Sequence, residues 1–130
     1  MSETASVLRG IPAPRDRWEG YATQRREILE HIDSMSIRGV FWVAGDFHLA
    51  SAQTVATGTA PGAAQFEVLV GPAAQSPNIL AGSLGAPQFR WAAGTNNYSV
   101  LELDPVARTI TVRWIDGTGA EIHVETFDLP

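Results

Sequence analysis

The sequence contains no cysteine and no lysine. Without cysteine there are no disulfides, thiolate metal ligands or cysteine nucleophiles, so a metal would have to bind oxygen or imidazole nitrogen. All nine basic residues are arginines and the formal net charge is -5, which argues against a nucleic-acid backbone as a partner. The sequence also has no phosphate-binding loop with lysine and no Gly-x-Ser-x-Gly elbow, so nucleotide triphosphatases and serine hydrolases lose their main support.

Long apolar runs are missing too. No stretch approaches the roughly 20 residues of a membrane-spanning helix, and residues 1–10 lack the basic and apolar regions of a secretory signal. We therefore expect no membrane segment and no targeting signal in this chain, which leaves its localisation open. A length of 130 residues with 45% hydrophobic and 18% charged residues fits one folded domain.

The chain divides into a short lead-in and one domain. Residues 1–15 contain two prolines and no periodicity, which predicts an extended segment, and 16–130 form the domain. A helix is predicted over about 17–34, because Asp16 and Glu19 make a capping-box-like start and apolar residues recur at helical spacing. These apolar positions are Tyr21, Ile28, Ile32 and Met35. His31 lies at the edge of the polar face, where we expect it to be exposed to solvent.

Strands are predicted on both sides of a long irregular stretch. Residues 40–44 are continuously apolar and rich in β-branched and aromatic side chains, which predicts a strand buried on both faces. A helix followed by such a strand indicates an α/β layer. Within 56–94 only the segment 65–70 resembles a strand, and the rest predicts a long loop.

The end of the chain predicts an antiparallel meander. Its strands are expected at 98–103, 109–115 and 121–129, joined by turns at Asp104-Pro105 and Asp116-Gly117. Ile110, Val112 and Trp114 alternate with polar residues and are expected to face the core. The same alternation places His123 on the wet face.

A candidate site follows the first predicted strand. Gly45-Asp46-Phe47-His48 comes directly after residues 40–44, and ligands in α/β folds gather at the carboxyl ends of strands. Asp46 and His48 are two residues apart and offer a carboxylate oxygen and an imidazole nitrogen, which divalent metals accept. The alternative is structural: Asp46 caps the next turn and His48 lies at a wet strand end.

The surrounding sequence resembles a known family. Asp16-Arg17-Trp18-Glu19-Gly20-Tyr21, an arginine at 25 or 26, the helix, and then Val43 to His48 are similar to the last conserved block of PhoD-like (alkaline phosphatase D) metallophosphoesterases. In that family a D-x-W-x-G-Y helix precedes a strand that ends in G-D-x-H. Asn96-Asn97-Tyr98 and the strands after it also resemble the family's C-terminal strands. By this resemblance the chain is the C-terminal portion of such a protein.

The resemblance implies a calcineurin-like α/β/β/α sandwich, of which residues 16–130 would hold one long helix, a buried strand and the terminal meander. It implies a multinuclear metal centre that hydrolyses phosphate monoesters or diesters through metal-activated water. His48 would be a metal ligand, and Asp46 a ligand or a nearby carboxylate. The resemblance suggests iron and calcium as the metal ions, with manganese or zinc as further candidates. Export from the cell is common in the family.

The chain also departs from the family pattern. The other Asp-containing and Asn-His-Asp metal motifs are expected before Asp16, where none occurs, and two ligands cannot hold a dinuclear centre. We therefore expect a partial domain that is inactive alone and is completed by a missing N-terminal half or by self-association. Its substrate when complete would be a phosphate ester. The alternative is a non-catalytic α+β interaction module derived from such an enzyme.

Overall fold

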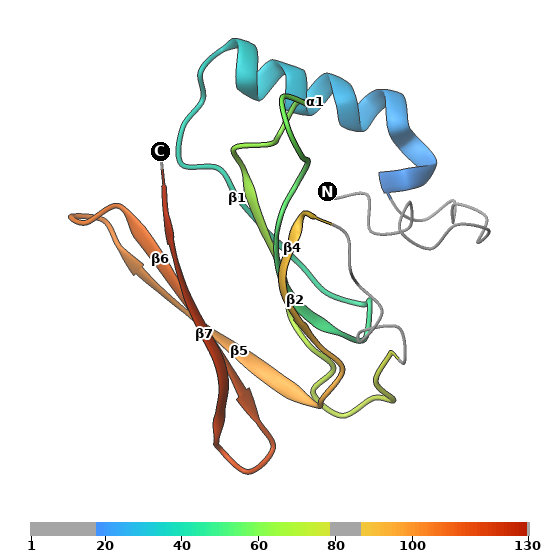
Figure 1. The fold of residues 1–130 in the computed structure, drawn as a ribbon, viewed down its shortest axis with the longest axis vertical. Coiled ribbons are helices and arrows are strands. Elements are labelled where there is room, and N and C mark those ends of the chain that lie inside the picture. The colour runs from blue at the N-terminus through green and yellow to red at the C-terminus, as the bar shows by residue number, and fades with distance from the viewer. Residues whose placement is uncertain (1–17, 79–86, 130) are drawn as a thin grey trace.

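The structure is a computed structural model that describes residues 18–78 and 87–129. These residues form one α-helix and two β-sheets, a mixed α/β architecture (Figure 1). The four-stranded sheet has the order β1-β3-β2-β4 and the three-stranded sheet has the order β5-β6-β7. No helix in this part of the chain is long and apolar enough to cross a membrane. The predicted lead-in at 1–15 and the predicted helix start at Asp16 lie outside the described residues.

The helix α1 (Ala22–Ser34) ends where the sequence predicts and follows a 3-10 turn, η2 (Trp18–Tyr21). The predicted apolar face is only partly correct. Tyr21 and Met35 are 51% and 64% exposed, whereas the buried residue of the helix is Leu29. Leu29 and the neighbouring Ile28 pack against the rest of the fold, whereas the two ends of the predicted apolar stripe stay in water. His31 is exposed, as predicted.

The four-stranded sheet contains two strands that the sequence did not predict. β1 (Phe41–Ala44) runs parallel to β3 (Phe66–Leu69), and these two correspond to predicted strands. Between β3 and β4 (Phe89–Ala93) lies β2 (Ala50–Thr54), antiparallel to both. The predicted long loop over 56–94 is therefore shorter than expected, because it gives up residues to β4.

The prediction that residues 40–44 are buried on both faces is wrong. β1 lies at one edge of the described sheet and pairs only with β3 there. None of its residues is fully buried, and Val43 is 52% exposed. The continuous apolar run matched the pattern of a central parallel strand, but a strand with one neighbour keeps part of its surface in water.

The C-terminal meander is confirmed. It consists of β5 (Asn97–Asp104), β6 (Thr109–Asp116) and β7 (Glu121–Asp128), paired in sequence order. Aspartates hold both turns, as their positions predicted. Asp104 Oδ1 accepts hydrogen bonds from the backbone N–H groups of Val106 and Ala107, at 2.9 and 2.8 Å. Asp116 Oδ1 accepts from the backbone and hydroxyl of Thr118 and from the backbone of Ala120.

The main core lies between the two sheets. It contains seven buried residues: Ala50, Ala52, Val68, Ile110, Val112, Trp114 and Phe127. The alternating residues of β6 face inward, as predicted, and Trp114 is fully buried. Phe127 of β7 lies edge-on to Phe41, with ring centroids 5.2 Å apart, and contacts Phe66 at 5.0 Å. Aromatic contacts therefore join the third strand of the meander to two strands of the other sheet.

The layers follow from strand register. Val68 faces the meander, so its neighbour Glu67 and the paired Trp42 point to the opposite face of the four-stranded sheet. On that face Trp42 packs against the cluster formed by Leu29 of α1 and Val55. The described part of the chain thus has a helix layer, a four-stranded layer and a three-stranded layer (Figure 1).

A buried polar chain runs along the helix-facing side of β2 and β3. The Ser51 hydroxyl donates to Gln53 Oε1 at 2.8 Å, and Gln53 Nε2 donates to Glu67 Oε2 at 2.8 Å. All three side chains are at most 1% exposed. Burial of these polar groups is tolerated because they bond one another.

The loop between β2 and β3 is tied to the helix. The Gly62 N–H donates to Asp33 Oδ2 at 2.9 Å, and Gln65 Nε2 donates to Asp33 Oδ1 at 3.2 Å. Gly62 has a φ of 86°, and a Cβ there would lie 3.0 Å from Val55 Cγ1 and 3.1 Å from Leu29 Cδ2. Glycine is required at this position by conformation and by space together.

The prediction that His123 faces water is wrong. Its ring stacks on Trp91, with centroids 4.3 Å apart and planes 9° apart, and lies 5.5 Å from Trp114. A register shift between Trp114 and Ile115 pairs these residues with His123 and Glu121, so Ile122 is an extra residue in β7. The bulge lies beyond His123, whose direction follows from regular alternation with the buried Phe127, because both pair with inward-facing residues of β6.

Candidate functional site

The tetrapeptide Gly45-Asp46-Phe47-His48 lies at the carboxyl end of β1, where the sequence placed it. β1 and β3 are parallel, so the end of β3 meets it at the same edge of the sheet, and the Val70 N–H donates to the Ala44 carbonyl at 2.9 Å. Strand ends of this kind carry ligands in α/β folds.

The backbone of the tetrapeptide is unusual. Asp46 has a φ of 65° and His48 a φ of 56°, both in the left-handed region that favours glycine. Residues other than glycine persist there only when their surroundings hold them, and such positions cluster at functional sites. Two such residues in one tetrapeptide mark it as a candidate site.

His48 has a defined ring orientation. Its side chain is half-buried, and Nδ1 lies 3.0 Å from the backbone carbonyl oxygen of Ser76. A carbonyl oxygen only accepts hydrogen bonds, so Nδ1 is the donor. In the neutral imidazole the lone pair is then on Nε2, which is the arrangement that metal-binding histidines usually show.

Asp46 is exposed to solvent. Its carboxylate has no bonding partner among the described residues, which does not support the alternative that it caps the next turn. A carboxylate and an imidazole two residues apart in sequence suit iron, zinc or manganese, and the carboxylate alone suits calcium. The chemistry of the two donors therefore fits a metal of the kinds that the sequence suggested.

Two donors are fewer than the four to eight that such ions take. Within residues 18–78 and 87–129 no group of three or more His, Cys, Asp or Glu side chains is placed to hold a metal. A complete centre would need donors other than the His, Cys, Asp and Glu side chains of this part of the chain.

The segment after β3 also belongs to the site, and the sequence did not indicate it. The Asn78 N–H donates to the His48 carbonyl at 2.6 Å, and Asn78 Nδ2 donates to the Phe47 carbonyl at 3.1 Å. These contacts join residues about thirty positions apart. The only hint in the sequence is an asparagine after Pro77, which is typical of turns but does not name a partner.

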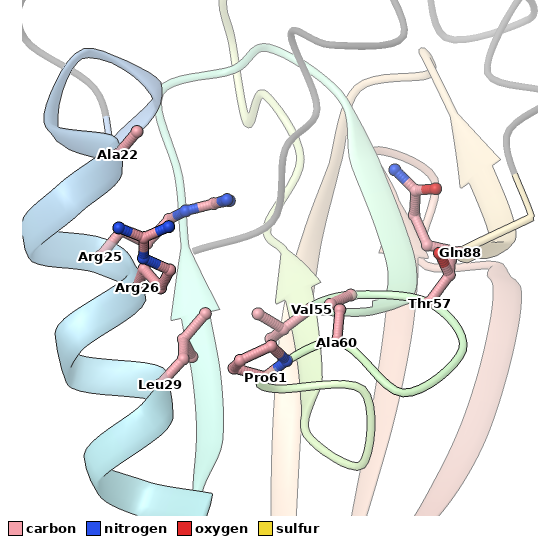
Figure 2. Close-up of a pocket in the computed structure, with 10 residues that line it drawn as sticks. Ala22, Arg25, Arg26, Leu29, Val55, Thr57, Ala60, Pro61 and Gln88 are labelled. Carbon is pink, nitrogen blue, oxygen red and sulfur yellow. The ribbon is translucent and has the colours of Figure 1, made fainter.

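Away from this turn, a hollow lies between the first half of α1 and the loop after β2, with a cavity volume of about 430 Å³. Figure 2 shows Arg25 and Arg26 of the helix on one side of it and Gln88 on the other. β2 begins near His48 and ends at this hollow, so about 17 Å of strand separates the two places. The described residues that line it include no acidic or imidazole side chain, so it is not part of the candidate metal site.

A family model described as PhoD-like phosphatase matches residues 2–105. The match includes the tetrapeptide and the 76–78 segment and ends before β6 and β7. Comparisons with curated proteins and with solved structures give no match.

Proposed function

The chain belongs to the PhoD-like phosphatase family, and we propose that it carries part of the metal site of a phosphoric ester hydrolase. His48 would bind the metal through Nε2, and Asp46 would be a second ligand or a nearby carboxylate. The observation that carries this proposal is the 3.0 Å contact from His48 Nδ1 to the Ser76 carbonyl, which leaves Nε2 as the basic nitrogen at a strand end. The expected ions are iron and calcium, with manganese or zinc as further candidates.

A bound cation would activate water and stabilise negative charge on the phosphoryl oxygens. The residues of this chain would hold the cation and orient the groups that bind it. His48 presents a neutral nitrogen whose direction is set by the Ser76 carbonyl. The Asp46 carboxylate adds negative charge, which favours cation binding. Among the described residues no group of three His, Cys, Asp or Glu side chains could hold the metal, so we propose that the chain is a partial domain that does not hydrolyse phosphate esters alone.

We also propose that its layers belong to a calcineurin-like sandwich. The support is the stacking of a helix on one face of the four-stranded sheet and of a second sheet on the other face. In this proposal the exposed edge at β1 is where the remainder of the sandwich, or a second copy, adds to the sheet. An edge strand with an exposed Val43 is the type of surface on which such addition takes place.

The test is metal retention by the purified chain, by His48→Ala and by His31→Ala. Each protein is equilibrated with iron, calcium, manganese or zinc in turn, and loose ions are removed before metal is measured. We expect retention by the parent chain and by His31→Ala, whose changed residue is exposed, and loss of metal in His48→Ala. At one hundred times the dissociation constant, the metal should raise the free energy of unfolding by about 2.7 kcal/mol.

Hydrolysis of a model phosphomonoester and phosphodiester is measured on the same metal-loaded samples. We expect none from the chain alone, and turnover would refute its being a partial site. If none of the three proteins retains metal and a chelator does not change the melting temperature, the metal proposal is wrong. The chain would then be either a severed fragment of such an enzyme or a non-catalytic interaction module.

A further inference from the structure

Hydrogen bonds connect the His48 turn to the segment that ends at Asn78. His48 Nδ1 donates to the Ser76 carbonyl, the Asn78 N–H donates to the His48 carbonyl, and Asn78 Nδ2 donates to the Phe47 carbonyl. The side chain, the backbone of His48 and the backbone of its neighbour are thus each held from one short segment. Asn78 supplies two of these bonds, one from its backbone and one from its side chain.

The bond to Ser76 selects one form of the imidazole ring. Neutral histidine carries its proton on either nitrogen, and in water neither position is fixed by the protein. A carbonyl acceptor beside Nδ1 favours the form with the proton on Nδ1. The lone pair then lies on Nε2, which points away from the Ser76 carbonyl and is available to a metal.

This selection depends on where the turn lies. His48 has a left-handed backbone with a φ of 56°, so its local chain conformation is not one that the residue would adopt by itself. Asn78 fastens the carbonyl groups of Phe47 and His48, one on each side of the His48 N–Cα bond. Without its side chain the turn loses the bond from Asn78 Nδ2 to the Phe47 carbonyl, which helps to keep the ring next to Ser76.

We propose that Asn78 is a positioning residue of the metal site: it fastens the His48 turn to the 76–78 segment, where the Ser76 carbonyl fixes Nε2 as the coordinating atom. The metal part of this inference rests on the proposed function, and the orientation of the ring does not. Loss of an outer partner of a metal-binding histidine typically weakens metal binding by about 10- to 100-fold. We expect an effect in that range for Asn78→Ala.

The first experiment reads the ring directly. Long-range proton–nitrogen correlation spectra of the metal-free protein at about pH 8, where an ordinary histidine is neutral, show which nitrogen of each ring is protonated. The chain has three histidines, so the exposed His31 and the stacked His123 are internal references. We expect the Nδ1-protonated form for His48 and a shift toward a mixture in Asn78→Ala. A parent His48 that carries its proton on Nε2 would overturn the proposal.

The second experiment measures metal affinity by calorimetry with zinc or manganese alone. Asn96→Ala is the matched control, because Asn96 is exposed and lies outside the site. The positioning role of Asn78 is supported if Asn78→Ala binds the metal at least 10-fold more weakly than Asn96→Ala does and its thermal melt is unchanged. Equal affinities in the two variants would refute it.

The two proposals fail in different ways. A parent chain that binds no metal removes the proposed function, and with it the metal role of Asn78, while the spectra still decide whether Asn78 orients the ring. A parent chain that binds metal while Asn78→Ala changes neither the spectrum nor the affinity removes only the positioning role.

Discussion

Phe127→Ala should cost the protein a large share of its stability. Phe127 is 1% exposed and its ring contacts Phe41 and Phe66 across the gap between the sheets. Truncation of a buried phenylalanine to alanine typically costs about 3–5 kcal/mol, because burial is lost and a cavity remains. Whole domains are stable by only about 5–15 kcal/mol, so about a fifth or more of the total is at stake.

The size of this effect has a structural reason. Four of the seven buried residues in the main core come from β6 and β7, and these strands lie after the family-matched residues 2–105. At about 1.5–3 kcal/mol for each buried apolar side chain, the four together contribute roughly 6–12 kcal/mol. This is similar to the whole net free energy of unfolding of a domain. The matched part should therefore not fold without the last two strands.

The assay is urea unfolding followed by tryptophan fluorescence. A loss of 3–5 kcal/mol with a slope of about 2 kcal/mol per molar lowers the midpoint by roughly 2 M. The control is Val124→Ala on the same strand, which changes a side chain that is 42% exposed and should cost under about 1 kcal/mol. A Phe127→Ala midpoint equal to that of Val124→Ala, or a cooperatively folded 1–105 chain, would refute the reasoning.

Three further predictions concern turns. Gly62→Ala should destabilise by about 2–3 kcal/mol and Gly58→Ala by about 1 kcal/mol, because both have positive φ but only Gly62 has side chains within 3.1 Å of the added Cβ; thermal melts of the pair measure the difference. Asp46→Ala should be about 1 kcal/mol less stable than Asp46→Gly, since alanine resists a φ of 65°, and chemical unfolding of the two variants tests this. Donation from the side chain and backbone of Thr118, and from the backbone of Ala120, lowers the pKa of Asp116 below its ordinary 3.8. Its contribution to stability is therefore present above that value and lost as pH falls through the lower pKa of the folded state; unfolding at about pH 6 and about pH 3 should show a smaller acid loss for Asp116→Asn, and equal losses would contradict it.

The meander was predictable because its signals are local. Alternating apolar residues in β6 and an aspartate at each turn specify strands and connections without help from the rest of the fold. The bulge in β7 has no such signal, since Ile122 and His123 look like an ordinary alternating pair. The orientation of His123 comes from pairing across the sheet, where it lies opposite Trp114.

β2 escaped prediction for a different reason. Its sequence, Ala50 to Thr54, has small and polar residues where a central strand usually has large β-branched or aromatic ones. Its burial is created by its neighbours: alanines fit beneath the meander, and Ser51 and Gln53 bond toward Glu67 on the other face. A residue 14 positions away, Glu67, makes Gln53 acceptable in the interior, and a pattern read along one strand does not contain it.

In the candidate site, too, the local features were predictable from the sequence and the contacts with distant residues were not. The sequence identified Asp46 and His48 as donors at a strand end, because the chemistry of side chains and the end of an apolar run are both local. The partners that orient His48 are 28 to 30 positions away and the left-handed backbone depends on them, so neither was predictable. A chain selected for stability alone would favour glycine at a φ of 65°, since glycine adopts it without strain. If Asp46→Gly proves more stable than the parent and loses metal, the aspartate is kept for its carboxylate; if it is more stable and binds metal unchanged, His48 must find its other ligands elsewhere.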